Sequence, residues 1–103
     1  MIIVNLIYVP GKEFEALGIV KGNIVRAESI RKDVFSTMGR LAKGEIPGYT
    51  EMLAEARKVA TKRMVAEAEN LNADAVINVK YETAGVAEGT VEILAYGTAV
   101  RFK

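Results

Sequence analysis

The sequence predicts an α+β protein with two layers: a mainly antiparallel four-stranded sheet with one long and one shorter helix. Three observations lead to this prediction. Four short segments rich in β-branched residues are separated by turn residues. Residues 49–71 carry an uninterrupted helical pattern with no internal Gly or Pro. The length of 103 residues fits a single domain, 1–103, with one core.

The strands are predicted from short apolar runs bounded by turn residues. The first run ends at Pro10-Gly11, and its apolar residues on both sides predict a strand buried on both faces. The second run is interrupted by Gly22-Asn23, which predicts a bulge or a turn there. Residues 12–17 are expected to connect these two strands. The four predicted strands are 2–9, 18–27, 74–83 and 90–102.

Two helices are expected. Ser29 is a suitable N-cap for the shorter helix, over about residues 30–43, whose apolar positions recur every three or four residues. In the long helix, a broad apolar arc includes Met52, Ala56, Ala60 and Leu71. Asn72 follows where a helix end favours a left-handed residue, and Asn is second to Gly at that position.

The two faces of the last strand predict different neighbours. One face carries the small residues Ala95, Gly97 and Ala99, which allow the long helix to approach closely. The other face is bulky and apolar, with Tyr96 and Phe102 among its residues. Another subunit or the shorter helix could cover this second face. We favour another subunit, because 57 of the 103 residues are apolar or glycine, above the usual share of about 45–50%.

Composition excludes several function classes. The chain has no Cys and no His, so it has no thiolate or imidazole for catalysis or for a zinc or copper site. Its formal net charge of +1 argues against nucleic acid or an anionic membrane surface as a partner. The apolar N-terminal run lacks the basic flank of a signal peptide. We therefore expect a cytoplasmic protein with no cofactor.

Arg63 and Glu67 interrupt the apolar arc of the long helix. They could lie beyond the sheet edge, pair across a subunit interface, or line a polar pocket. We expect Arg63 to reach a carboxylate or carbonyl beyond its own helix, with Glu92 or a neighbouring subunit as its source. We also expect that partner to be buried.

Six short segments together carry a family resemblance. These segments are 22–26 (GNIVR), 44–53 (GEIPGYTEML), 55–57 (EAR), 63–64 (RM), 74–76 (DAV) and 95–100 (AYGTAV). In combination they resemble the YbjQ-like family of "putative heavy-metal-binding" proteins. The resemblance covers about residues 17–102 and implies small α/β subunits, similar in shape to dodecin subunits. It also implies pentameric rings in which added strands join neighbours. The sequence departs from the family at Lys43-Gly44, where Gly-Gly is usual, and at Leu71-Asn72-Ala73, where Leu-Gly-Ala is usual.

Three functions remain open: a non-catalytic homo-oligomeric binding module, an enzyme that uses Glu or Lys, and a purely structural ring. The lack of His lowers the expectation of an enzyme. The family's metal description has no Cys or His ligands here, so we expect no metal site beyond a hard cation. We expect a homopentamer that holds a small ligand at its interfaces. The candidate ligand or interface residues are Asn23, Arg26, Glu45, Tyr49, Arg57, Arg63, Glu67, Glu92 and Tyr96.

Overall fold

The computed structural model describes residues 1–27, 48–85 and 89–103. The predicted shorter helix at 30–43, its N-cap Ser29 and the candidate residue Glu45 lie outside these ranges. The described elements are β1 (Ile2–Ile3), β2 (Phe14–Ala27), α2 (Tyr49–Asn70), β3 (Ala75–Ala84) and β4 (Thr90–Phe102).

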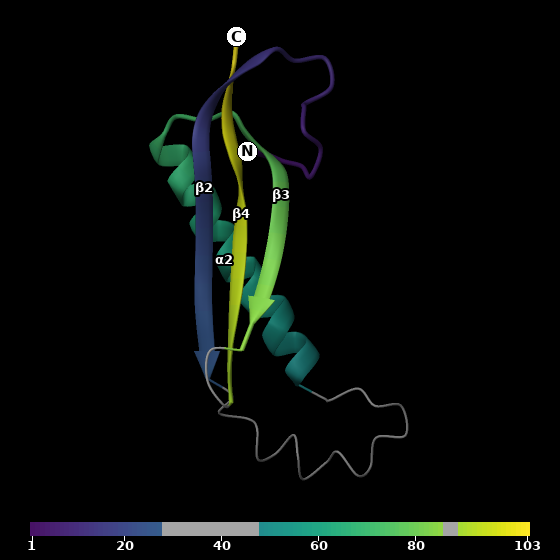
Figure 1. The fold of residues 1–103 in the computed structure, drawn as a ribbon, viewed down its shortest axis with the longest axis vertical. Coiled ribbons are helices and arrows are strands. Elements are labelled where there is room, and N and C mark those ends of the chain that lie inside the picture. Colours follow the sequence, from purple (N-terminus) through teal and green to yellow (C-terminus); the bar gives the residue numbers. More distant parts are fainter. Residues whose placement is uncertain (28–47, 86–88) are drawn as a thin grey trace.

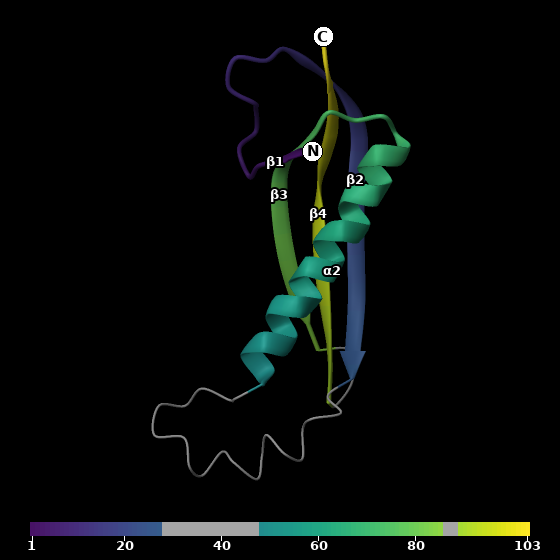
Figure 2. The same cartoon turned by 180° about the vertical axis from the view of Figure 1, so that it is seen from behind.

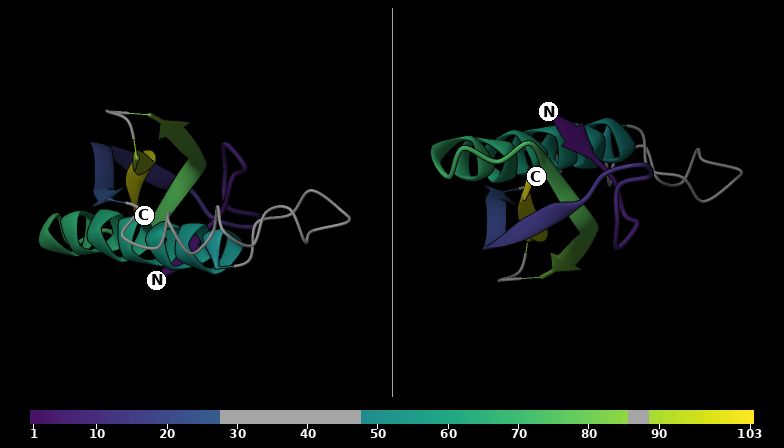
Figure 3. Two further views of the ribbon diagram at one scale, coloured as in Figure 1. Left: turned by 90° about the horizontal axis from the view of Figure 1, so that it is seen from below. Right: turned by 90° about the horizontal axis from the view of Figure 1, so that it is seen from above.

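The strands form one mixed sheet in the order β1-β3-β4-β2. β4 pairs antiparallel with both β2 and β3, and the short β1 pairs parallel with β3. α2 crosses one face of this sheet diagonally (Figures 1 and 2). Seen end-on, the helix forms one layer and the strands form the other (Figure 3). The predicted α+β class and the mainly antiparallel four-stranded sheet are confirmed, with one parallel pair in addition.

The face of β4 that carries small residues packs against the helix, as its composition predicts. Ala95 and Ala99 are fully buried in one cluster with Ala56, Ala60 and Met64 of α2. Gly97, between the two alanines, lies so close to Val76 and Ile77 of β3 that a Cβ there would clash. Small residues therefore bring this strand close to both the helix and its neighbouring strand.

The C-terminal end of α2 has the predicted left-handed residue. Asn72 has a φ of 57°. Its N–H donates to the Glu69 carbonyl at 2.9 Å, and the Ala73 N–H donates to the Ala68 carbonyl at 3.0 Å. These two bonds make a Schellman motif, which satisfies carbonyls that the helix itself leaves free.

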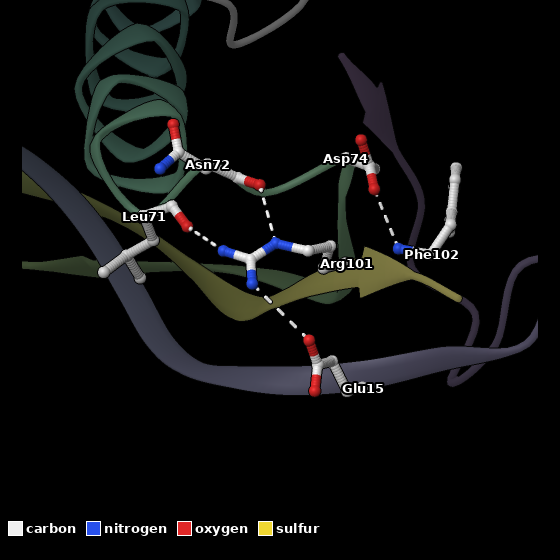
Figure 4. Close-up of polar contacts among 6 residues, drawn as sticks. All are labelled: Glu15, Leu71, Asn72, Asp74, Arg101 and Phe102. Atoms are coloured by element: carbon white, nitrogen blue, oxygen red, sulfur yellow. Dashed lines mark hydrogen bonds and ion pairs between the residues drawn. The ribbon is translucent and has the colours of Figure 1, made fainter.

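Arg101 of β4 binds this helix end from outside (Figure 4). Its guanidinium donates to the Leu71 carbonyl at 2.9 Å and to the Asn72 carbonyl at 3.3 Å, and it lies 3.5 Å from the Glu15 carboxylate. A cation at a helix C-terminus also interacts favourably with the helix dipole. Arg101 therefore joins the end of α2 to the ends of two strands.

The contact between α2 and the sheet is narrower than the predicted arc. Its four buried residues recur once per turn, at Ala56, Ala60, Met64 and Ala68, whereas Leu71 is 41% exposed. The prediction that Leu71 belongs to the buried arc is wrong, because the helix has passed the sheet edge by that point. Three alanines at the contact allow the helix backbone to lie very near β2.

The predicted irregularity at Gly22-Asn23 is also wrong. β2 pairs regularly with β4 from Gly18 to Ala27. The register shift in β2 lies between Ala16 and Gly18, and the strand starts at Phe14, inside the predicted connector. Gly22 instead allows α2 to lie close to β2, because a Cβ at this position would be 2.3 Å from the Ala60 carbonyl oxygen.

β3 contains a second irregularity that decides which side chains face the helix. Its register with β4 shifts between Ile77 and Lys80, at Asn78, which has a φ of 53°. An extra residue in one strand reverses the faces of all residues beyond it. Val79 and Tyr81 therefore share the helix side, while Lys80 and Glu82 lie on the opposite face.

The predicted first strand at 2–9, buried on both faces, is wrong. Only Ile2–Ile3 form a strand, and Ile7 is 73% exposed. Val4 continues the backbone bonding to β3, and the Asn78 N–H then donates to the Leu6 carbonyl at 2.7 Å. A parallel pair of strands needs a regular backbone in both strands, and the bulge at Asn78 makes β3 irregular. The pairing of β1 with β3 therefore stops there. Val9 still packs against Ala75, Ile77 and Val100 and covers one end of the sheet's second face.

Candidate functional site

We define the open face as the side of the sheet turned away from α2, between the N-terminal segment and the far ends of the strands. Side chains alternate between the faces of a strand, and residues opposite each other on paired strands share a face. The strand registers place four cross-strand rows on this face. These rows are Ile19–Thr98–Ile77, Lys21–Tyr96–Lys80, Asn23–Leu94–Glu82 and Val25–Glu92–Ala84.

Two hydrogen bonds connect polar side chains diagonally across the open face. The Asn23 amide Nδ2 donates to Glu92 Oε2 at 3.0 Å, from β2 to β4. The Tyr96 hydroxyl donates to Glu82 Oε1 at 3.2 Å, from β4 to β3. Three of the predicted site residues, Asn23, Glu92 and Tyr96, are thus brought together on one surface.

The environment of Tyr96 changes its acidity. Partial burial raises the pKa of the phenol above its ordinary value of 10.0, and the hydrogen bond to Glu82 and that residue's negative charge raise it further. Each cause disfavours the phenolate. Tyr96 is therefore a neutral hydrogen-bond donor over the physiological range.

The open face also exposes apolar side chains. Ile19 is 79% exposed and Val25 is 52% exposed, one on each side of the polar rows. Leu94 and Tyr96 are half-buried between them. The surface thus combines exposed β-branched side chains with polar, hydrogen-bonded side chains at its centre. This composition is typical of a protein–protein contact surface.

Arg63 and Glu67 lie elsewhere, at the free edge of β2. Arg63 Nη1 donates to the Asn23 carbonyl oxygen at 2.7 Å, and the Lys21 N–H donates to Glu67 Oε1 at 3.0 Å. The prediction that Arg63 reaches a carbonyl beyond its own helix is confirmed. Glu92 is not that partner within the chain, and it bonds Asn23 instead. The predicted buried partner is also wrong for the single chain, because the Arg63 contact is exposed.

The remaining site predictions are dispersed. Arg26 lies on the helix side of β2, where its Nε is buried and has no partner among the described residues. Arg57 is exposed on α2, and its carbonyl accepts a bond from Thr61. Tyr49 is half-buried at the start of α2. None of these three shares the open face.

Sequence reasoning did not place Lys21, Lys80 and Glu82 at the site. Lys21 and Lys80 lie directly opposite Tyr96, one on each neighbouring strand, and Glu82 accepts the phenol's hydrogen bond. Simple alternation along β3 puts Val79 and Tyr81 on this face instead. The only sequence signal for the reversal is Asn78, a residue type that tolerates positive φ.

The donor set does not suit a heavy-metal site. The chain has no Cys or His, and the described residues contain no group of three or more Asp or Glu side chains that could hold a metal ion. Zinc and copper favour sulfur and nitrogen donors. In the ranges that the structure describes, no helix combines the length and apolar character needed to cross a membrane.

The sequence of this chain matches a protein family over its whole length. The model of the YbjQ family, described as "putative heavy-metal-binding", matches residues 1–103. The chain therefore belongs to this family. Its relatives include UPF0145 proteins of Clostridium novyi, with 46% identity over 98% of both chains, and of Alkaliphilus metalliredigens, with 48% identity over 99% of both. A third, from Thermotoga petrophila, is 50% identical over 100% of this chain and 98% of its own.

A solved structure shares the fold at lower sequence identity. It is a protein of unknown function from Pediococcus pentosaceus, described as a member of the DUF74 family. Its TM-score is 0.71 and its identity is 19%, over 100% of this chain and 98% of that one. At this identity the similarity concerns the fold alone.

Proposed function

We propose that this chain is a cytoplasmic, non-catalytic subunit of a closed homo-oligomer, a pentamer, that holds a small ligand where subunits meet. The observation that carries the proposal is the open face. Ile19 and Val25 are 79% and 52% exposed there, beside a network of hydrogen-bonded polar groups. A subunit that contacts this face would remove those apolar groups from water.

The N-terminal segment gives further support for association. Ile7 is 73% exposed and Tyr8 is 52% exposed, and Leu6 is 42% exposed. These residues and the open face lie on different parts of the chain. If the N-terminal residues of one subunit contact the open face of the next, the interface is head-to-tail. Such interfaces form rings when their rotation closes. Five subunits is the number that the family resemblance implies.

The ligand contacts we assign are the polar groups in the middle of the open face. Asn23 and Tyr96 each present a hydrogen-bonding side chain there, and Lys21 and Lys80 lie beside Tyr96. These groups suit a small polar molecule better than a heavy metal ion, because the donors are oxygen and nitrogen of amide, hydroxyl and ammonium type. The chemistry is recognition, without a nucleophile or general base in an assigned role.

Native mass spectrometry of freshly purified, tag-free protein tests both parts together. Five times the subunit mass with a retained small molecule is the expected result. A ring without any retained molecule contradicts the binding role and favours a purely structural ring. A mass of 11.2 kDa at micromolar concentration contradicts the assembly itself.

A pair of substitutions tests whether the open face is the contact. Leu94→Glu places a second carboxylate directly opposite Glu82 in the middle of the open face, and it should dissociate the oligomer because burying two like charges together is costly. Leu71→Glu makes the same change at the end of α2, away from this face, and should leave the mass unchanged. Equal masses for the two variants would contradict an interface on the open face.

A further inference from the structure

The free edge of β2 carries two hydrogen bonds from α2 that resemble those of a neighbouring strand. β2 is the outermost strand of the sheet, so one side of its backbone has no strand partner among the residues that the structure describes. At this edge, the Glu67 carboxylate accepts from the Lys21 N–H, as a strand carbonyl would. The Arg63 guanidinium donates to the Asn23 carbonyl, as a strand N–H would.

The spacing of the two side chains matches the spacing of the two backbone groups. Arg63 and Glu67 are four residues apart on a helix, a rise of about 6 Å. Lys21 and Asn23 are two residues apart on a strand, a rise of about 6.8 Å. The N–H and C=O groups of alternate residues point to the same side of a strand, so Lys21 and Asn23 both direct these groups to the free edge.

Gly22 lies between these two residues and makes the arrangement possible. An added Cβ would be 2.7 Å from Arg63 Cβ and 2.3 Å from the Met64 nitrogen. The missing side chain thus brings the helix close enough for two side chains to reach around the strand to its edge.

The part of β2 next to these two bonds would promote association between copies of the chain if its edge were exposed. Residues 19–25 read Ile-Val-Lys-Gly-Asn-Ile-Val, with four β-branched residues, one charge and no proline. Segments of this composition pair readily with other strands when an edge is exposed. The segment also complements itself: antiparallel pairing about Gly22 places Ile19 of one copy opposite Val25 of another.

We propose that Arg63 and Glu67 form an edge guard, which occupies the backbone groups of Lys21 and Asn23 and prevents β2 from pairing with β2 of a second copy. Pairing also requires α2 to move off the strand, and the two bonds oppose that movement. The guard explains why two charged residues interrupt the apolar side of α2. The inference does not rest on the proposed binding function, because it concerns the sheet edge and compares variants with the wild type.

The test replaces both guard residues by methionine, which keeps an aliphatic stem and removes the donor and the acceptor. In Arg63→Met/Glu67→Met, we expect the Lys21 amide to exchange hydrogen at least tenfold faster at low concentration. We also expect the average mass to rise with concentration beyond the wild-type mass. The matched control Lys62→Met/Glu69→Met, at exposed positions of the same helix, removes the same two charges and should behave as the wild type.

Two further variants separate the guard from its alternatives. Arg63→Lys/Glu67→Gln retains a donor and an acceptor, so it should keep the wild-type mass. Adding Asn23→Pro to the methionine variant should remove the rise of mass with concentration, because proline removes an N–H that points to the free edge and blocks strand addition. Wild-type behaviour of the methionine variant, equal association of the control, or association that survives the proline would each overturn the proposal.

Discussion

Gly22 of β2 and Ala60 of α2 approach so closely that a Cβ built on the glycine would lie 2.3 Å from the alanine's carbonyl oxygen. The obstacle is helix backbone, which cannot rotate away as a flexible side chain would. The close packing of α2 on β2 therefore requires glycine at position 22.

Gly22→Ala should destabilise the fold by about 2–3 kcal/mol, because the whole helix must shift to admit a methyl group. Gly85→Ala is the matched control, since nothing lies within 4 Å of an added Cβ at that position. Urea denaturation followed by circular dichroism measures the difference. Equal midpoints for the two variants would show that the helix accommodates the methyl group without strain.

Arg101→Met should cost about 1–2 kcal/mol, because it removes two charge-assisted bonds from the exposed end of α2. Glu15→Gln should cost less than about 0.5 kcal/mol, because the ion pair with Arg101 is long and about half exposed. The same denaturation experiment compares them. If Glu15→Gln costs as much as Arg101→Met, the ion pair rather than the helix cap is the stabilising contact.

Tyr96 should titrate above the ordinary tyrosine pKa of 10.0. Its pKa is raised in the folded state, so its contribution to stability is fully present below pH 10.0 and is lost as the pH rises through the raised value. Absorbance at alkaline pH should show a late phenolate that disappears in Tyr96→Phe. Glu82→Gln should lower the late pKa without removing it. A titration that is the same in all three proteins contradicts the assigned environment.

Zinc and copper should show no tight stoichiometric binding at neutral pH, in contrast with the family's description. The chain has no Cys or His to act as ligand. Calorimetry on tag-free protein measures this directly, since a histidine tag would itself bind these ions. A reproducible tight site would show that oxygen donors brought together by assembly suffice.

The sequence predicts the parts of the fold in which one local pattern dominates. β4 spans the predicted residues 90–102, and α2 ends one residue before the predicted position, with Asn72 in the expected conformation. Long periodic segments and the residues at helix ends can be predicted because their structure depends on neighbouring residues in the sequence.

The missed features depend on contacts between distant segments. The bulge at Asn78 exists only relative to β4, and it alone determines that Lys80 and Glu82 face Tyr96. Residues 2–9 read as a buried strand because they are apolar, yet only Ile2–Ile3 find a regular partner in β3. The charge pattern of α2 marks Arg63 as unusual but gives no information about which strand the helix crosses.

The bulge in β3 also limits how this segment of the chain can change in length. Deletion of Asn78 would remove the bulge, and Ile77, Val79 and Lys80 would then alternate along the strand, so Lys80 and Glu82 would stay on the open face. Val79 and Tyr81 would stay on the helix side. Loss of both Asn78 and Val79 would instead turn Lys80 and Glu82 toward the alanines of α2. Insertions or deletions beyond Ala84 leave both faces of β3 unchanged. Related chains that are shorter between Ile77 and Lys80 should accordingly lack the one bulge residue and keep both faces of the strand.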